Sequence, residues 1–344
     1  MGDRFLTKEI VDTDNHQYAI TTVDSYLTHD KKKLLIVDTD AGSDDGVAIL
    51  NLLGAEKNSR NIKTVLITTV QGNTHVDIVG RNVLKVLKTS NRLNIPVFRG
   101  LNESLLYTPE TDYFYGSDAF GDFYFPDPPS EDLIKTKHAV NALIESVAAY
   151  PGKLSLVCLG PLTNIAMAAK MDDTFLRNLR EIFVLGGSDS GIGNIKPGRE
   201  FNFYMDPEAA YVVLNGVERV KKRLNLVTWE TASKRTTVSM DWRKNVLGAL
   251  NSSAVELINK AEKPQLVGDT WISADTILTS IVIDDKLIEK SSDYHAIVEP
   301  FGEYSKGALF IDYQSDRNQT KNIRLIEKID TETYKNMLLQ NLKH

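Results

Sequence analysis

The sequence predicts an α/β fold: a single large domain with a mostly parallel central sheet covered by helices on both faces. Apolar runs of strand length alternate along the chain with longer runs of helical length. The first strand-length run is apolar throughout, which is typical of a strand buried on both faces. The 344 residues contain no internal repeat, low-complexity tract or clear linker, so a second domain is not expected.

The first half of the chain sets the pattern. Residues 1–30 are polar and weakly periodic, and we interpret them as an N-terminal extension packed on or flanking a main domain of residues 31–344. The strands predicted in this half are Leu34–Val37, Ile62–Thr69, Ile95–Phe98 and Leu154–Leu159. The helices predicted between and after them are Val47–Gly54, Val76–Leu87, Ala139–Tyr150 and Asn164–Lys170.

The second half continues the alternation and ends in a mixed region. The predicted strands are Ile182–Leu185, Leu224–Val227, Ala296–Val298, Ala308–Ile311 and Ile323–Ile329. The predicted helices are Pro207–Asn215, Trp242–Leu250, Ala254–Lys260, Ala274–Ile283 and Thr331–Leu342. In parallel sheets of this kind the ligand lies beyond the carboxyl ends of the strands, so that is where functional motifs are expected.

Composition excludes several classes of function. The net charge is −6 and there is no basic stripe, so a nucleic-acid polymer is not an expected partner. No segment approaches the ~20 apolar residues of a membrane span, and the N-terminus lacks an apolar signal core, so a cytoplasmic protein is expected unless a signal peptide has been removed. The single cysteine, Cys158, lies in an apolar strand and is interpreted as a core residue. A core of this size needs no metal to fold, so a metal site would serve chemistry.

The most informative motif places four carboxylates within eight residues, directly after the first strand. Asp38 and Asp40 are two residues apart and point the same way in extended backbone, whereas Asp44 and Asp45 open the next helix. Helix capping would explain one or two of these carboxylates, but not the pair at the strand end. Converging carboxylates raise each other's pKa unless a cation offsets them, so the motif predicts a site for a hard divalent cation.

Two enzyme families begin with such a strand end. Haloacid-dehalogenase-type phosphatases carry Asp-x-Asp-x-Thr/Val, but Gly42 stands where that pattern has Thr or Val. Asp38-Thr-Asp-Ala-Gly-Ser-Asp-Asp45 resembles the Asp-x-Asp-Pro-Gly-x-Asp-Asp signature of nucleoside hydrolases, with Ala41 in place of Pro. The further blocks that resemble this family, in order, are Gln71-Gly-Asn73, Leu159-Gly-Pro-Leu-Thr-Asn-Ile-Ala166, Leu185-Gly-Gly187 with Gly193-Asn194 and Glu200-Phe-Asn-Phe-Tyr-Met-Asp-Pro-Glu-Ala-Ala210, and Ala274-Asp275.

The resemblance, which runs from about Leu34 to Asp284, implies a Rossmann-like fold and a calcium-dependent enzyme similar to the inosine–uridine preferring nucleoside hydrolases. It implies that calcium is bound by Asp40, Asp45, Asp275 and the backbone carbonyl of Leu159. It also implies that Asp40 is the general base, and that Asp38 is a supporting carboxylate. The residues that match the ribose contacts of the family are Asp44, Asp275, Asn73, Asn194, Glu200 and Asn202.

The sequence departs from the family where the leaving base is activated. Ala274 and Tyr115 stand at the two positions where members with broad inosine–uridine preference carry histidine. The segment Tyr107–Phe125 contains eight aromatic residues in nineteen, and purine-selective members stack the base between aromatic rings. Tyr115 and Phe120 are therefore candidates for base stacking, with Tyr113, Phe114, Trp229 and Trp271 as further candidates. The alternative is that these rings pack the loop onto the core.

The sequence therefore predicts hydrolysis of the N-glycosidic bond of ribonucleosides by a calcium-activated water, with purine nucleosides slightly favoured. The bond would break through an oxocarbenium-like sugar, and a site that binds the 2′-hydroxyl would reject deoxynucleosides. Two alternatives remain: a non-catalytic nucleoside- or calcium-binding homologue, because both family histidines are missing, and a phosphatase of the dehalogenase type. A homodimer or homotetramer is expected by analogy with the family.

Overall fold

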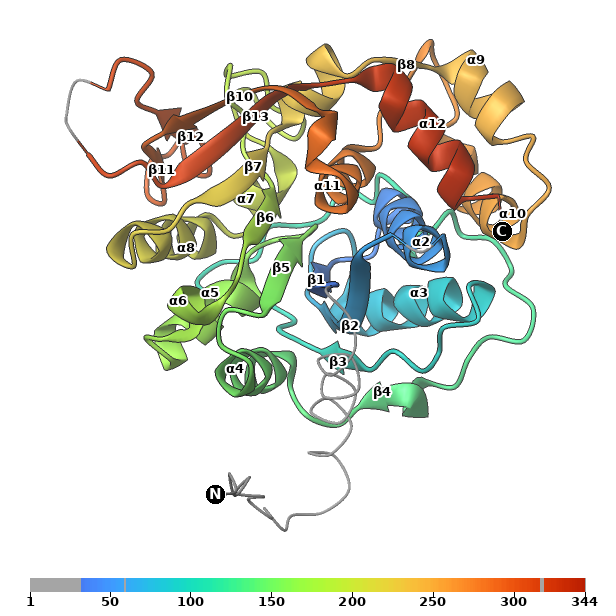
Figure 1. Ribbon diagram of the computed structural model, residues 1–344, viewed down its shortest axis with the longest axis horizontal. Coiled ribbons are helices and arrows are strands. Elements are labelled where there is room, and N and C mark those ends of the chain that lie inside the picture. Colours follow the sequence, from blue (N-terminus) through green and yellow to red (C-terminus); the bar gives the residue numbers. More distant parts are fainter. Residues whose placement is uncertain (1–31, 59, 316–318, 344) are drawn as a thin grey trace, which may run out of the picture.

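The protein is built on one large sheet flanked by helices (Figure 1). The computed structural model describes residues 32–58, 60–315 and 319–343, so the extension predicted at residues 1–30 lies outside the described residues. The sheet has nine strands in the order β10-β13-β7-β6-β5-β1-β2-β3-β4. Every neighbouring pair is parallel except β10 and β13, which are antiparallel. The predicted α/β fold with a mostly parallel sheet is confirmed.

The strands of this sheet are β1 (Lys33–Thr39), β2 (Ile62–Thr69), β3 (Val97–Arg99), β4 (Ile134–Lys135), β5 (Leu154–Cys158), β6 (Ile182–Leu185), β7 (Leu224–Val227), β10 (Ile288–Tyr294) and β13 (Ile323–Ile329). Two small antiparallel pairs are formed by β8 (Val238–Ser239) with β9 (Thr270–Trp271) and by β11 (Ala296–Val298) with β12 (Leu309–Ile311).

The longer helices are α2 (Ser43–Lys57), α3 (Val76–Thr89), α4 (Ala139–Ala149), α5 (Thr163–Met171), α8 (Pro207–Arg219), α10 (Ser253–Ala261), α11 (Ala274–Ile283) and α12 (Thr331–Asn341). The short helices are α6 (Phe175–Asn178), α7 (Phe201–Met205) and α9 (Met240–Trp242), with π-helical turns η2 (Thr231–Arg235) and η3 (Arg243–Leu247) and 3-10 turns η1 (Glu131–Leu133), η4 (Lys263–Gln265) and η5 (Asp285–Leu287).

Two hydrophobic cores lie on opposite faces of the sheet. Side chains of a strand alternate between faces, and in β1 this sends Leu35 and Val37 into one core and Leu34 and Ile36 into the other. Helices α2, α3, α10, α11 and α12 cover the first core, and α4, α5, α6 and α8 cover the second (Figure 1). This is why the strands read as continuous apolar runs.

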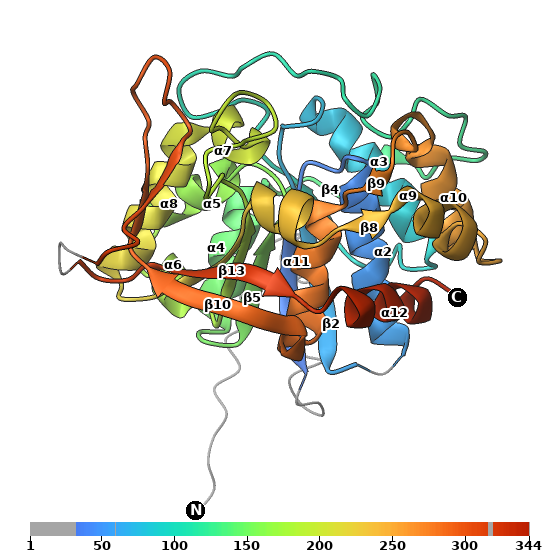
Figure 2. The ribbon, with the colours of Figure 1, turned by 90° about the horizontal axis from the view of Figure 1, so that it is seen from above.

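The loops that carry function gather at one edge of the sheet. The long segment between β3 and β4 runs along that edge, opposite the end at which β1 begins (Figure 2). Because the strands from β7 to β4 are parallel, their carboxyl ends meet there. No helix in the described ranges is long and apolar enough to cross a membrane.

The short elements β4, β8, β9, α6 and α7 were not predicted, and two larger features also differ from the expectation. Strand β10 was not predicted because it is an edge strand with a polar sequence, IEKSSDY, that buries none of its residues fully. The helix predicted at Trp242–Leu250 is instead α9 followed by the π-helical turn η3. There the buried Arg243 guanidinium donates hydrogen bonds to Glu262 at 2.7 Å and Asn259 at 2.8 Å, so η3 packs around a charged side chain.

Candidate active site

The site begins in the tight turn between β1 and α2. Ala41 has a φ of 33°, a left-handed conformation that is uncommon for a residue with a side chain. The Gly42 N–H donates to the Asp45 carboxylate at 2.9 Å, and the Thr39 hydroxyl donates to the same carboxylate. A Cβ at Gly42 would lie 2.7 Å from the Asn73 side-chain nitrogen, so the turn is pressed against the loop after β2. Any side chain at position 42 would have to displace Asn73.

Helix α11 adds one more carboxylate, that of Asp275, from far along the chain. Asp275 lies in its first turn, and α11 packs directly against α2. The Asn51 side-chain amide of α2 donates to the Thr279 hydroxyl at 3.3 Å and to the Ser280 hydroxyl at 3.0 Å, which fixes the two helices together. As a result one carboxylate oxygen each of Asp44, Asp45 and Asp275 lies within 4.8 Å of the others.

Burial and mutual repulsion shift the pKa values of this acidic cluster. Burial, the largest cause, and the charge of Asp44 together raise the pKa of Asp45 to about 8. Burial also raises the pKa of Asp44, and burial and the charges of neighbouring carboxylates raise those of Asp40 and Asp275 well above the usual value. Asp44 and Asp275 also share a hydrogen bond, and Oδ1 of Asp275 is buried without a partner. Hard oxygen donors that repel one another in a buried place fit a divalent cation.

Two glycines leave room for Asp40. A Cβ at Gly72 would lie 2.1 Å from Oδ2 of Asp40, and a Cβ at Gly160 would lie 2.6 Å from Oδ1. The backbone N–H of Asn73 donates to Oδ2 at 2.9 Å. Asp40 is only 1% exposed, so these contacts fix the direction of its carboxylate.

Asp38 lies behind the site rather than in it. Its Oδ1 accepts from the Thr68 hydroxyl and from the Asn164 amide at 2.8 Å, and burial raises its pKa to about 7. It does not line the cavity described below. Asn164 is likewise a buried linker, because it also donates to the Thr69 carbonyl at 2.9 Å.

A cavity of about 560 Å³ opens above these carboxylates at the carboxyl ends of the strands. It brings together ten of the predicted residues: Asp40, Asp44, Asp45, Asn73, Tyr115, Leu159, Asn194, Glu200, Asn202 and Asp275. Asp40 and Asp275 therefore line the same cavity although they are far apart in the sequence.

The predicted ribose ligands on the far wall are held by the backbone. Glu200 caps α7: its carboxylate accepts from the N–H groups of Asn202 at 2.8 Å, Phe203 at 3.1 Å and Gly187 at 2.8 Å. Burial raises the pKa of Glu200 to about 7 despite these donors. The Asn202 amide donates to the Leu159 carbonyl at 2.6 Å, so the carbonyl predicted to bind calcium already has one partner. Glu200 therefore caps α7 and also lies in the cavity wall.

The aromatic candidates fall in different places. Tyr115 lines the cavity, and its hydroxyl donates to Asp44, where burial raises the tyrosine pKa well above its usual value. The stacking role predicted for Phe120 does not hold: it is 0% exposed, and a Cβ at Gly46 of α2 would lie 2.8 Å from its ring. Phe120 packs the loop onto the core because α2 and α3 bury it. Trp271 is also buried and absent from the cavity wall, whereas Phe114 and Trp229 line it.

Several wall residues were not predicted from the sequence. Phe201 stands between Glu200 and Asn202 and was detectable from that motif. The remaining ones lie outside any recognised block, and they are Asp112, Ile192, Ile195, Ser233, Lys234 and Ile272.

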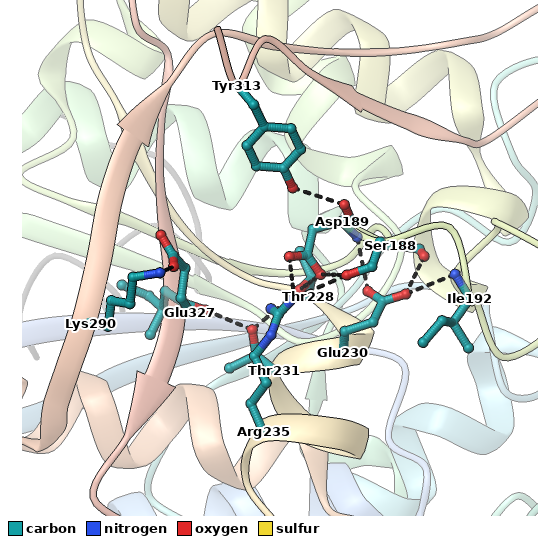
Figure 3. Close-up of polar contacts among 12 residues, drawn as sticks. Ser188, Asp189, Ile192, Thr228, Glu230, Thr231, Arg235, Lys290, Tyr313 and Glu327 are labelled. Carbon is teal, nitrogen blue, oxygen red and sulfur yellow. Dashed lines mark hydrogen bonds and ion pairs between the residues drawn. The ribbon is translucent and has the colours of Figure 1, made fainter.

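A buried carboxylate shapes one side of the cavity (Figure 3). Glu230 accepts from the Ser188 hydroxyl and from the N–H groups of Asp189 at 2.9 Å and Ile192 at 3.0 Å. The Arg235 guanidinium pairs with Asp189 at 2.7 Å. These contacts tie the loop of residues 188–195 to the segment of residues 229–235, and both segments line the cavity.

The fold and the site together define a parallel α/β protein with a buried acidic centre at its strand ends. Residues 35–336 match the family described as "Inosine-uridine preferring nucleoside hydrolase". The chain therefore belongs to the inosine–uridine preferring nucleoside hydrolase family, and the resemblance inferred from its motifs is confirmed.

Known relatives and solved structures agree with this assignment. The chain is 36% identical to "Probable uridine nucleosidase 2" of Arabidopsis thaliana over 54% of this chain and 56% of that protein, so the match spans little more than half of that relative. It is 33% identical to "Pyrimidine-specific ribonucleoside hydrolase RihB" of Escherichia coli O157:H7 over 67% of this chain and 72% of that protein. A solved inosine–guanosine nucleoside hydrolase superimposes with a TM-score of 0.82 at 28% identity, covering 90% of this chain and 98% of that one.

Proposed function

We propose that this protein hydrolyses the N-glycosidic bond of ribonucleosides to ribose and free base, using a bound calcium ion. The observation that supports this most strongly is that Asp275 lines one cavity with Asp40 and Asp45, although it lies far from them along the chain. Chains of this family are named for that chemistry, and the proposal carries it to this one.

The acidic centre fits calcium by its donor set. Asp40, Asp45 and Asp275, with the Leu159 carbonyl, would hold the ion, because calcium takes six to eight oxygen ligands in flexible geometry. A cation there supplies positive charge that lowers the pKa of a coordinated water and offsets the repulsion of the carboxylates. The unpartnered Oδ1 of Asp275 is a further argument that the centre is built for a cation.

The chain's own side chains supply the remaining roles. The carboxylate of Asp40 is held in place by Gly72, Gly160 and the Asn73 N–H. We assign Asp40 the role of general base, which accepts a proton from the attacking water. Asp44 and Asp275 would accept hydrogen bonds from the ribose 2′- and 3′-hydroxyls. Contacts to the hydroxyls strengthen as the sugar becomes oxocarbenium-like, which is how binding energy becomes rate.

The other polar wall residues complete the ribose site in this proposal. Asn73, Asn194, Glu200 and Asn202 surround the sugar, and Glu200 and Asn202 are held rigidly by the contacts of α7. The base would lie against Phe114, Phe201 and Trp229. Because these three rings could stack on a purine base, we still expect a slight preference for purine nucleosides. Relatives of the chain nevertheless include proteins named for uridine and for pyrimidine nucleosides.

A reducing-sugar assay tests the proposal. Purified protein in millimolar calcium is incubated with inosine, guanosine, adenosine, uridine and cytidine, with and without chelator. We expect ribose release that chelation abolishes and that Asp40→Asn lowers by about 10²–10⁴-fold. Nucleoside binding in calorimetry without any ribose release would instead establish the non-catalytic homologue. Light scattering of the same sample tests the expected homodimer or homotetramer.

A further inference from the structure

The departing base needs a partner in the cavity wall other than the acidic cluster. When the C–N bond breaks, its electron pair stays on the base nitrogen, which must be neutralised or protonated. Among the described residues that line the cavity, none is histidine. Ala274 has no donor, and the Tyr115 hydroxyl is already bonded to Asp44 beside the sugar. This inference rests on the proposed function and concerns how that reaction expels the base.

One cationic side chain stands in the cavity wall. Of the lining residues in the described part of the chain, Lys234 is the only lysine or arginine, whereas Asp40, Asp44, Asp45 and Asp275 make another part of the wall acidic. The Lys234 ammonium has no hydrogen bond or ion pair within the described ranges. Its neighbour Ser233 also lines the cavity, and the Ser233 hydroxyl is buried without a partner. Donors from two adjacent residues are therefore available in the cavity wall, which Trp229 also lines.

The segment that carries Lys234 is anchored on both sides (Figure 3). The Thr231 hydroxyl donates to the Ile326 carbonyl of β13 at 2.6 Å, and Arg235 pairs with Asp189 at 2.7 Å. Arg235 also donates to the Ser190 hydroxyl at 3.0 Å. The backbone at Lys234 is therefore held between two anchored residues, and only the flexible lysine side chain has to adjust to the base.

We propose that the Lys234 ammonium donates a hydrogen bond to the leaving base and transfers its proton as the C–N bond breaks, with the Ser233 hydroxyl as a second donor to the base. Water adds its oxygen to C1′, and its proton passes to Asp40. The base nitrogen keeps the electron pair of the broken bond and takes the proton from Lys234. Asp40 then returns its proton to solvent and Lys234 regains one, so the sum is nucleoside plus water to ribose plus neutral base. The substrates that suit these donors are ribonucleosides whose base carries a carbonyl oxygen or an unprotonated ring nitrogen.

A substrate with a good leaving group separates this role from a structural one. p-Nitrophenyl β-D-ribofuranoside expels a stable phenolate and needs no protonation. We expect Lys234→Met to lower kcat/KM for inosine and uridine by about 10²–10³-fold, while the p-nitrophenyl riboside changes by less than about threefold. Calcium affinity and the midpoint of thermal unfolding should be unchanged.

A matched variant controls for the loss of a positive charge nearby. Lys234 also borders a second hollow of about 780 Å³, which Lys290 lines, paired there with Glu327. Lys290→Met should leave both substrates unaffected. Equal losses on both substrates in Lys234→Met, or no loss on the natural nucleosides, would overturn the inference. Failure of the wild type to hydrolyse either substrate would instead refute the proposed function.

Discussion

Replacing Asp45 by asparagine should change how stability depends on pH in the metal-free protein. Asp45 is 1% exposed, and burial raises its pKa from 3.8 to about 8. Between pH 5 and pH 7 the carboxyl is ionised in the unfolded chain and protonated in the folded one. The unfolded state therefore binds fewer protons, and stability falls as pH rises, by about 1.4 kcal/mol per pH unit for this one group. Over these two units Asp45 alone lowers the free energy of unfolding by roughly 3 kcal/mol.

Urea unfolding followed by circular dichroism at pH 5, 6 and 7, in chelator, measures this slope. Asp45→Asn should lose stability with pH less steeply than the wild type, by about 1.4 kcal/mol per unit. Calcium binds the ionised cluster, so its stabilisation of the wild type should grow from pH 5 to pH 7. Parallel pH dependences for the two chains, or a calcium effect that does not grow with pH, would refute the reasoning.

Three further changes have distinct expected outcomes. Gly72→Ala places a Cβ 2.1 Å from the Asp40 carboxylate, so kcat in the reducing-sugar assay should fall at least about tenfold while circular dichroism stays native; unchanged kcat would show that the orientation of Asp40 is unimportant. Phe120→Ala removes a fully buried ring and should lower the free energy of unfolding by about 3–5 kcal/mol in denaturant titrations. A raised KM with an unchanged free energy of unfolding would instead restore a stacking role. Glu230→Gln weakens the hydrogen bond that the Ile192 N–H donates to this side chain. Steady-state kinetics should therefore show a larger fold-change in KM than in kcat. A larger fold-change in kcat would indicate that Glu230 takes part in the chemical step.

The sequence was most informative where function depends on short local patterns. The strand that ends in Asp38 and Asp40, and the helix that Asp44 opens, were predictable because an apolar run and a glycine turn determine them locally. That Asp275 would reach the same cavity followed from the family resemblance, since local pattern cannot show that α11 packs against α2.

Other parts of the site depend on packing that sequence periodicity does not encode. The sequence identifies the loop that is rich in aromatic residues. It does not show that Phe120 packs into the core whereas Phe114 lines the cavity. Lys234 belongs to no motif, and the segment that carries it is held against the loop of residues 188–195 by long-range contacts of Arg235 and Glu230. Strand β10 escaped prediction because an antiparallel edge strand needs no apolar run.

Anomalous diffraction from crystals grown in calcium, with ribose or a nucleoside analogue added, tests the central claim most directly. We predict one calcium ion in the cavity, about 2.3–2.6 Å from oxygens of Asp40, Asp45 and Asp275, with the sugar hydroxyls against it. A cavity without calcium at saturating concentration, or an ion that leaves Asp275 uncoordinated, would contradict it.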